Sequence, residues 1–422
     1  MMKPLTPADE YAVANYSASK HRQCGMYLLL TALLAAGILF VLLHIITLSQ
    51  KVQRQTEIEQ VAHYAAESMG VIAARDLNLK AILNRAMLAN EMAIGQIIGL
   101  HTWYEMSRQT STNMATVTVW IPYLNSVSAK LAQLMNQMRG PMRAGVKSAI
   151  VLQQWVINGL ASAQQVFHQA SWLASIATAI DIVEGTDENL ELVLMNHQTL
   201  LDLDNIWLRM QSATTSPSNR QDYVDMVADS RDPFSRRRTY RWFSAFNVAA
   251  HKAGGSEIST LADGRIAWRS LDTSQLHLQY LLHNQYLPIG GGASYLQQRL
   301  PSARNSPGYG DSYRINWTTS RYTVRKQQNL QIQHRSPHYF RYQSTRRAPQ
   351  ITVVVRERKE VEEQGGGPQW GAGRVELYFH RPKELWPRED NKQEIANLHN
   401  ALWQVRRKNI SEAERRLIGA QL

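Results

Sequence analysis

Cysteine is almost absent from this chain of 422 residues, because Cys24 is the only one. A single cysteine excludes internal disulfides and cysteine-rich zinc sites. Charged residues make up 19% of the chain and hydrophobic residues 44%, which excludes collagen-like and fully disordered classes. A chain of this length is expected to fold into two or three units, each with its own core.

Recognisable catalytic motifs are also lacking. The glycine cluster at 290–292 is not followed by the Lys-Ser/Thr pair of a phosphate-binding loop. Neither His-Glu-x-x-His nor Gly-x-Ser-x-Gly occurs, and Cys24 stands next to an apolar segment. Asp202 and Asp204 are two residues apart, so on a helix they would not share a face as an acid/base pair. We therefore expect a protein that is not an enzyme and that has no cofactor, catalytic residue or metal site.

Proline is missing from two long stretches of the first half, residues 8–121 and 142–216. Alanine, leucine, methionine and glutamine are abundant there, and all of them favour helices. The absence of the main helix breaker from such stretches predicts long helices over residues 52–213.

Apolar residues recur at steps of three or four at 124–138 and 152–183, and a third stripe with steps of four and seven runs through Leu190, Leu194, Leu201 and Leu208. Helix ends are predicted at Gly140-Pro141 and at Gly185, with Thr186 as the cap of a following helix. Such stripes are typical of helices that pack on one another. We interpret them as core contacts in a helical bundle or antiparallel coiled coil.

One apolar run is long enough to cross a bilayer. Met26–Leu48 has His44 as its only strongly polar residue, and a helix of these 23 residues is long enough to cross a hydrocarbon core of about 30 Å. The stretch 149–183 is interrupted by several glutamines, so we expect a single span. The predicted organisation is a cytoplasmic tail over 1–24, a lipid-embedded anchor over 25–49, and a periplasmic remainder. A weak excess of positive charge before the span places the N-terminus in the cytoplasm and the residues after about 50 on the other side of the membrane.

Charge divides the chain near residue 213. Residues up to 213 carry 14 Lys and Arg against 15 Asp and Glu, and residues 214–422 carry 32 against 19. The helical region would thus cover 50–213, and a basic, β-rich domain with a partly irregular segment at 299–350 would follow. The overall class is α+β. Strands are predicted at 276–280, 322–324, 351–355 and 375–379, and a final short helix at 392–402.

A basic patch occurs where arginines alternate with aromatic residues. Arg236, Arg237, Arg238 and Arg241 are interleaved with Tyr240 and Trp242, a composition that can bind nucleic acid by charge and stacking. Outside a membrane, anionic lipid headgroups, cell-wall polymers or an acidic partner are better candidates. A solvated face without a ligand is the simplest interpretation, and nucleic acid is not favoured.

The segment from Ala74 to Glu91 reads ARDLNLKAILNRAMLANE. It resembles the TadE/TadG-like membrane proteins of bacterial Tad (tight adherence, Flp) pilus systems, and so do residues 376–382 and 402–406. The resemblance implies a non-enzymatic, single-pass component of pilus assembly or secretion whose partners are other assembly subunits. Leu30 stands where a processed prepilin would need glutamate, so a cleaved pilin subunit is not implied.

The polar residues of this segment, with the chain's end, form our candidate site. On a helix, Asn78 and Arg85 share a face, and the guanidinium of Arg85 could bind free carbonyl groups at a helix end. The site would be an intramolecular clamp onto the C-terminal domain or a docking surface for another subunit. It comprises Asn78, Asn84, Arg85, Asn90, Glu91, Trp403 and Arg406.

Other functional classes stay open at this point. A membrane-anchored periplasmic sensor with a ligand-binding helical bundle is the main alternative, although the short tail has no room for an output domain. A cell-wall enzyme is disfavoured because no nucleophile or acid pair stands out. A homo-oligomer is compatible with any of these functions.

Overall fold

The structure, a computed structural model, describes most of the chain. The described residues are 7–120, 122–193, 197–213, 216–245, 248–280, 283–300, 317–358, 369–382, 387, 389–390, 392 and 394–422. Within them, helices dominate the first half and strands the second, so the predicted α+β composition with a β-rich C-terminal region is confirmed.

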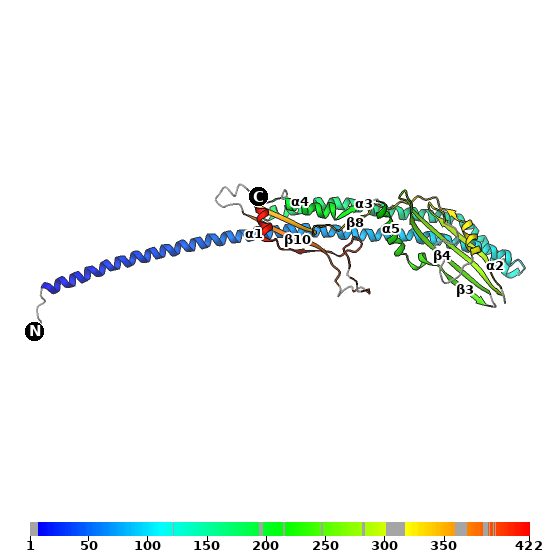
Figure 1. Cartoon of the computed structure of the whole chain (residues 1–422), viewed down its shortest axis with the longest axis horizontal. Coiled ribbons are helices and arrows are strands. Elements are labelled where there is room, and N and C mark those ends of the chain that lie inside the picture. Colours follow the sequence, from blue (N-terminus) through cyan, green and yellow to red (C-terminus); the bar gives the residue numbers. More distant parts are fainter. Residues whose placement is uncertain are drawn as a thin grey trace.

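The first element is one long helix, α1 (Pro7–Val117), of 111 residues. At 1.5 Å of rise per residue it is about 165 Å long. Its N-terminal part projects alone, while the remainder of the chain is packed around its C-terminal half (Figure 1). Its bounds match the proline-free interval from which long helices were predicted.

Two of the described helices are long and apolar enough to cross a membrane, α1 and α3 (Arg139–Thr186). In α1 the side chains from Tyr27 to Leu48 are all exposed, and its most apolar window has no contact with the rest of the protein. In α3 the corresponding window is 22% buried. The predicted long apolar helix near the N-terminus is therefore present as a candidate membrane span.

Helices α2 (Pro122–Gln137) and α3 run back along α1, antiparallel to it (Figure 1). The break between them falls at Met138, two residues before the predicted stop. Pro141 lies in the first turn of α3, where a missing backbone N–H leaves no helical bond unmade. Backbone bonds from Met138 N to Leu134 O (3.0 Å) and from Met142 N to Met138 O (2.9 Å) carry the helix through the break.

Three sheets are arranged along α1. The first is antiparallel in the order β1-β9-β10-β11, the second pairs β2 with β8, and the third has the order β3-β4-β5-β6-β7 with only β6 and β7 parallel. The strands are β1 (Leu190–Leu192), β2 (Gln211–Ala213), β3 (Tyr240–Ala245), β4 (Val248–Thr260), β5 (Ile266–Tyr280), β6 (His283–Tyr295), β7 (Gln328–Asn329), β8 (Phe340–Tyr342), β9 (Gln350–Glu357), β10 (Trp370–Phe379) and β11 (Trp403–Arg407).

Short helices lie between these strands, and one more, α9, follows the last of them. They are α4 (His197–Asp204), the π-helical turn η1 (Asn205–Arg209), α5 (Pro217–Asp229), α6 (Pro233–Arg236), α7 (Trp317–Arg325) and α9 (Glu412–Gly419). The predicted strands at 276–280, 351–355 and 375–379 lie within β5, β9 and β10 and are confirmed.

Several local predictions are wrong. Residues 322–324 belong to the helix α7, and the described part of 392–402 contains no helix. Residues 190–208 do not form one helix, because Leu190–Leu192 pairs with β9 as strand β1. Thr186 is the last residue of α3 and caps nothing that follows. For Leu190–Leu192, pairing with the distant strand β9 overrides the local sequence preference.

The segment 299–350, predicted to be partly irregular, contains α7, β7 and β8, and its residues 301–316 lie outside the described part. Strands β1 and β2, which precede residue 213, pair with β9 and β8, which follow it. The two predicted regions therefore share two of the three sheets, while the five-stranded sheet consists only of strands after residue 213.

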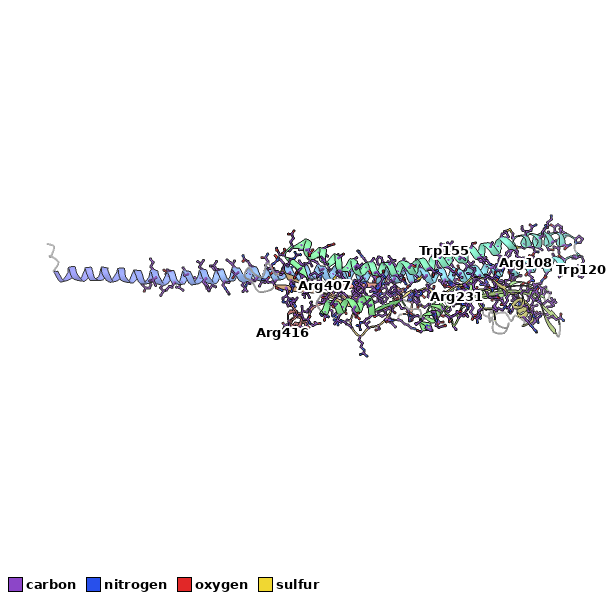
Figure 2. All side chains as sticks on the ribbon, turned by 90° about the horizontal axis from the view of Figure 1, so that it is seen from above. Arg108, Trp120, Trp155, Arg231, Arg407 and Arg416 are labelled. Atoms are coloured by element: carbon purple, nitrogen blue, oxygen red, sulfur yellow. The ribbon has the colours of Figure 1, made fainter. Side chains whose placement is uncertain are left out.

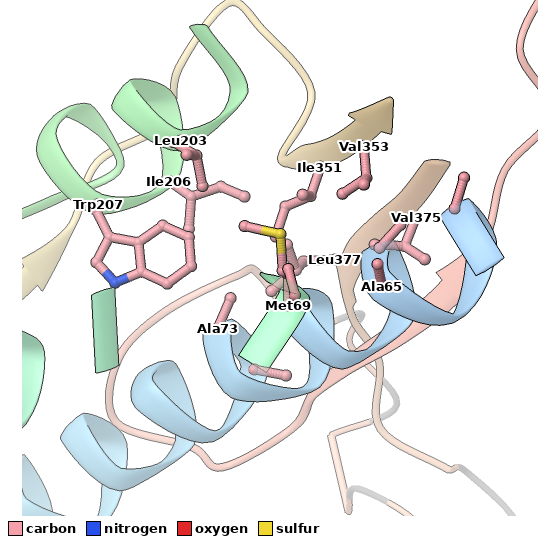
Figure 3. Close-up of a cluster of buried hydrophobic side chains, with 14 of the residues drawn as sticks. Ala65, Met69, Ala73, Leu203, Ile206, Trp207, Ile351, Val353, Val375 and Leu377 are labelled. Carbon is pink, nitrogen blue, oxygen red and sulfur yellow. The ribbon is translucent and has the colours of Figure 1, made fainter. Parts of the chain in front are cut away.

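Two hydrophobic cores lie along α1. In the first, Ala65, Met69 and Ala73 of α1 face the inner sides of β9 and β10 and the π-helical turn (Figure 3). Small residues on this face let the sheet approach the helix closely. The strand side of this core consists of Ile351, Val353, Val375 and Leu377, and Leu203, Ile206 and Trp207 close it.

The second core joins α1 to the five-stranded sheet and to α3. Ile94 and Ile98 of α1 pack with Trp268 of β5, and Ile150 and Ile157 of α3 complete the cluster. One uninterrupted helix thus supplies a wall of both cores. A displacement of α1 would have to disturb both sheets at once.

Glycines let strands lie directly on the backbone of α1. A β-carbon built on Gly373 of β10 would stand 2.5 Å from the carbonyl oxygen of Ala62. On β6, a β-carbon at Gly292 would stand 2.1 Å from the carbonyl oxygen of Thr102. Side chains cannot fit at these distances, so the cluster at 290–292 serves close packing.

The apolar stripes of α2 and α3 are core contacts only in part, contrary to our interpretation from the sequence. Leu160 and Ile176 pack against the cores, whereas most other members of the stripes are exposed. In the stripe at 124–138, Leu124 is 50% exposed and Leu134 55%. In the stripe at 152–183, Leu152 is 62% exposed and Leu173 71%, although Val183 is buried. The face of α3 that packs inward carries different residues, among them Ile150, Ile157, Ala161, Gln164, Ser171, Ser175 and Ala179.

Candidate functional site: polar contacts of the central helix

The predicted pair Asn78 and Trp403 meets in space, although the two residues are 325 positions apart. The side-chain Nδ2 of Asn78 donates to the carbonyl oxygen of Trp403 (2.9 Å), and the backbone N–H of Trp403 donates to Asn78 Oδ1 (2.9 Å). The amide group of Asn78 thereby bonds both backbone groups of the first residue of β11, as a neighbouring strand would. This contact fixes the register between α1 and the C-terminal sheet.

Asn84 holds four segments together from a buried position. Its Nδ2 donates to the carbonyl oxygens of Phe340 (2.8 Å) and Leu398 (2.7 Å), and its Oδ1 accepts from Gln164 Nε2 of α3 (2.6 Å). All of its principal hydrogen-bonding groups are therefore used inside the protein. Asn84 thus binds free backbone carbonyl groups, which is the role predicted from the sequence for its neighbour Arg85.

Arg85 itself is exposed and makes no hydrogen bond or ion pair among the described residues. It lies near His399, whose pKa is lowered by burial first, then by the charges of Arg341 and Arg85. Its expected role in binding free carbonyl groups is not seen. Asn90 donates only to Ala86 O of its own helix.

Arg406 is also outside the clamp. Its guanidinium pairs with Glu376 on the adjacent strand β10, with 3.0 Å between Nη2 and Oε2, and its side chain is 60% exposed. An exposed pair of this kind contributes at most about 1 kcal/mol to stability. The clamp proper thus consists of Asn78, Asn84 and Trp403.

Glu91 is the centre of a second buried contact. Its carboxylate accepts from Trp268 Nε1 (2.7 Å) and from Tyr223 OH (3.4 Å), and lies 2.8 Å from His334 Nε2. Burial raises the pKa of Tyr223 well above its usual value, and the charge of Glu91 adds to this, so the phenol keeps its proton. Glu91 therefore joins α1 to α5, to β5 and to the segment before β8.

A third contact, which was not predicted from the sequence, is centred on Lys80, whose side chain is fully buried. Its ammonium group lies 2.6 Å from Asp76 Oδ2, 2.6 Å from His168 Nδ1 of α3, and 4.3 Å from the ring centre of Phe340. Gln211 of β2 accepts a further bond. Burial lowers the pKa of Lys80 to about 8, and the charge of Asp76 limits the fall.

The predicted basic patch is not a continuous surface, because Arg238 is fully buried. Its Nη2 lies 2.9 Å from Asp272 Oδ2, and the same carboxylate accepts from Lys252 Nζ (2.6 Å) and from Thr102 Oγ1 of α1 (2.6 Å). Two cations face one carboxylate here. Burial lowers the pKa of Lys252, and Asp272 counteracts the fall.

The other arginines of the patch are exposed. Arg236 donates to the carbonyl oxygen of Asp229 (2.8 Å), and Arg241 donates to Ser244. Arg237, the residue before the buried Arg238, is exposed as well. Of the predicted patch, Arg236, Arg237 and Arg241 are thus exposed, and Arg238 is not.

These buried polar contacts attach α1 to α3, to α5 and to the sheets. Within the described part of the chain, no group of three or more His, Cys, Asp or Glu could hold a metal ion. The buried charged groups face one another, and the arrangement is suited to fixing positions. Figure 2 shows the resulting rod from above, with Trp120 at its far tip, Arg407 and Arg416 at the end of the packed part from which α1 projects, and Trp155 between these two ends.

Comparison with known proteins identifies no relative. No family model, no curated protein and no solved structure matches this chain.

Proposed function

We propose that this protein is a non-enzymatic, single-pass inner-membrane component of a bacterial Tad/Flp-type pilus assembly or secretion system, and that its periplasmic part acts as a scaffold. The N-terminus is cytoplasmic in this proposal, and residues 26–48 contact membrane lipid. Its partners are other assembly subunits.

One observation carries the proposal. The two stretches that resemble Tad pilus proteins, residues 74–91 and 402–406, lie at opposite ends of the sequence. They meet in the fold through the reciprocal bonds of Asn78 and Trp403. A shared signature whose two parts form one contact is what a conserved structural unit would produce, and Asn84 and Glu91 lie in the same unit.

The packing of α3 supports a single membrane crossing. Val183 at the end of α3 lies in the same core as Ile58 of α1, and Gln164 contacts Asn84. With residues 26–48 of α1 in the bilayer, α3 lies beside the part of α1 that has already left it. Residues 49–117 would extend about 100 Å from the membrane.

A scaffold role is favoured by the mechanical continuity of α1. The same helix that would be held in the bilayer forms a wall of both cores, so the anchor and the two sheets have a fixed relationship. Such a rod can hold partner subunits at a set distance from the membrane.

A deletion strain tests the function. We expect cells that lack this protein to lose surface pili, counted by electron microscopy, and to regain them with the wild-type gene. A matched variant without residues 1–48 but with an exported periplasmic part should not restore them. Unchanged piliation with altered transcription would contradict the proposal and favour the sensor alternative.

Orientation has its own test, because Cys24 is the natural cysteine at the edge of the anchor. A membrane-impermeant thiol reagent should label Cys24 only after the inner membrane is opened. A Cys24→Ser chain with Gln165→Cys, a residue exposed on α3, should react once the outer membrane alone is permeable. The reverse pattern would overturn the proposed topology.

A further inference from the structure

A continuous apolar stripe runs along the outer side of α2 and α3, and we call it the outer stripe. Its members are spaced alternately three and four residues apart, with one extra step of four at Met138, where α2 ends. They are Leu124, Val127, Leu131, Leu134, Met138, Met142, Gly145, Ala149, Leu152, Val156, Gly159, Ala163, Val166, Ala170, Leu173 and Ala177.

This spacing is the heptad repeat of a coiled-coil seam, and an added step of four is a known way of locally adjusting such a seam. Its largest members are open to solvent in the single chain. Val166 is 68% exposed, Leu173 71% and Leu152 62%. The inner face of α3 is already occupied by α1 and the two cores. Met142 of the outer stripe also packs against the second core, whereas the exposed members of the stripe form a second apolar face that no other described residue covers.

We infer that the outer stripe is the contact surface for a second copy of this chain, packed in parallel and in register as a two-stranded coiled coil. This inference uses the membrane anchor proposed above but not the role in pilus assembly. Two copies anchored through α1 in one membrane stand in the same direction and at the same height. Each stripe then meets its own equivalent.

The chemistry of the stripe fits a copy of itself. Residues 148–180 include no Asp, Glu, Lys or Arg, so two identical chains meet there without like-charge repulsion. Charged flanking positions are what usually select a different partner in a coiled coil, and here they are uncharged. In register, each residue of the stripe faces its own equivalent. Small residues such as Gly159 and Ala163 then permit close approach of the two helices, while Val166 and Leu173 fill other layers of the seam.

The available area is sufficient for a stable pair. The 54 residues from Leu124 to Ala177 extend about 80 Å, and helices in contact lie about 10 Å apart. A strip of these dimensions covers about 800 Å² on each chain, or about 1,600 Å² in total, which is the usual size of a specific interface.

An apolar groove widens the surface at the far end of the rod. It is lined by Leu100 and Trp103 of α1 together with Met138, Met142 and Gly145 of the outer stripe, and has a volume of about 450 Å³. The groove continues the stripe onto α1, so that side chains of the second copy gain a partly enclosed site there.

Disulfide formation in the full-length chain tests the register. In a Cys24→Ser background, Ala170→Cys places a thiol on the outer stripe, and Gln165→Cys places one on an exposed part of α3 away from it. A residue on a parallel, in-register seam lies opposite itself. We expect Ala170→Cys to form a dimer linked by one disulfide in native membranes, and Gln165→Cys to stay monomeric.

Mass measurement of the purified protein in detergent tests the stoichiometry. We expect two chains per micelle for the wild type, and one chain for the double variant Val166→Glu/Leu173→Glu, with at least about a tenfold weaker association. Both residues are exposed in the single chain, so helix content should not change. If the double variant unfolds, the disulfide experiment still decides.

Several results would overturn the inference. One chain per micelle for the wild type would mean that another protein covers the stripe, and three would exclude a two-stranded seam. Equal cross-linking at positions 165 and 170 would mean random collision. Protection of Ala170→Cys from water-soluble reagents by the bilayer would mean that α3 spans the membrane.

Discussion

Helices α1 and α3 run side by side, yet they distribute polar and apolar residues in opposite ways. The helix α1 buries Asp76, Lys80 and Glu91 completely, whereas α3 leaves Val166 and Leu173 largely exposed. Each buried charge on α1 has a partner within the same chain. The apolar face of α3 has none among the described residues.

The difference teaches that the buried charges of α1 find their partners within one chain, whereas the exposed apolar face of α3 does not. Burying an ion without a partner is costly, so the polar contacts of α1 require the sheets to be in place. Leaving a long apolar stripe in water forgoes roughly 25 cal/mol for each Å² that could be covered. A second surface that covers the stripe would remove the difference between the two helices.

The largest effect is expected from removing a carboxylate that serves two buried cations. Asp272→Ala leaves Arg238 and Lys252 without their counter-ion, and should lower the free energy of unfolding by about 3–5 kcal/mol. Denaturant unfolding of the full-length protein in detergent measures this. The control Asp181→Ala, at an exposed position, should change it by less than about 0.5 kcal/mol.

A pH effect should follow from Lys80, whose pKa is about 8 in the folded protein and 10.5 ordinarily. The unfolded chain binds the extra proton between these values, so stability is lower below pH 8 and rises towards pH 10.5. The rise amounts to about 3 kcal/mol for this group. The variant Lys80→Met should not show this rise in the free energy of unfolding. Parallel plots of that free energy against pH for the wild type and the variant would contradict the prediction.

A smaller loss is expected where a strand lies on the backbone of α1. Gly292→Ala forces a β-carbon to within 2.1 Å of Thr102 O, and overpacking of this kind costs about 1–3 kcal/mol. Gly140→Ala is a matched control, since nothing lies within 4 Å of its β-carbon. Equal thermal stability of the two variants would show that β6 can move away from α1.

The clamp should give the smallest of these effects. Asn78→Ala removes both bonds to Trp403 and should cost about 1–2 kcal/mol, with faster hydrogen exchange at the Trp403 amide. Asn90→Ala, which loses only a bond within its own helix, should change neither quantity appreciably. An unprotected Trp403 amide in the wild type would argue against the clamp.

Part of the fold could be predicted because its signals are local. The absence of proline between Pro7 and Pro122 predicts α1, and the β-branched run from Ile351 to Val355 predicts β9. The strand expected at 322–324 is a helix because its surroundings override a short β-favouring sequence. Apolar spacing on α3 identified a face correctly but could not say whether that face lies inside the chain.

The candidate site could be predicted from the sequence only in part. Resemblance identified Asn78 and Trp403, whose contact is present, and also Arg85, which points to solvent. Arg238 looked like a surface cation because its partner, Asp272, is 34 residues away. Buried polar partners come together through the tertiary fold, and a single sequence carries no record of such pairs.

The most direct test of the assembly role is to purify the tagged full-length protein from its native membranes in a mild detergent and identify the co-purifying chains by mass spectrometry. We predict recovery of pilus motor, platform or pilin subunits. A preparation free of them, from cells that are making pili, would contradict the proposed function.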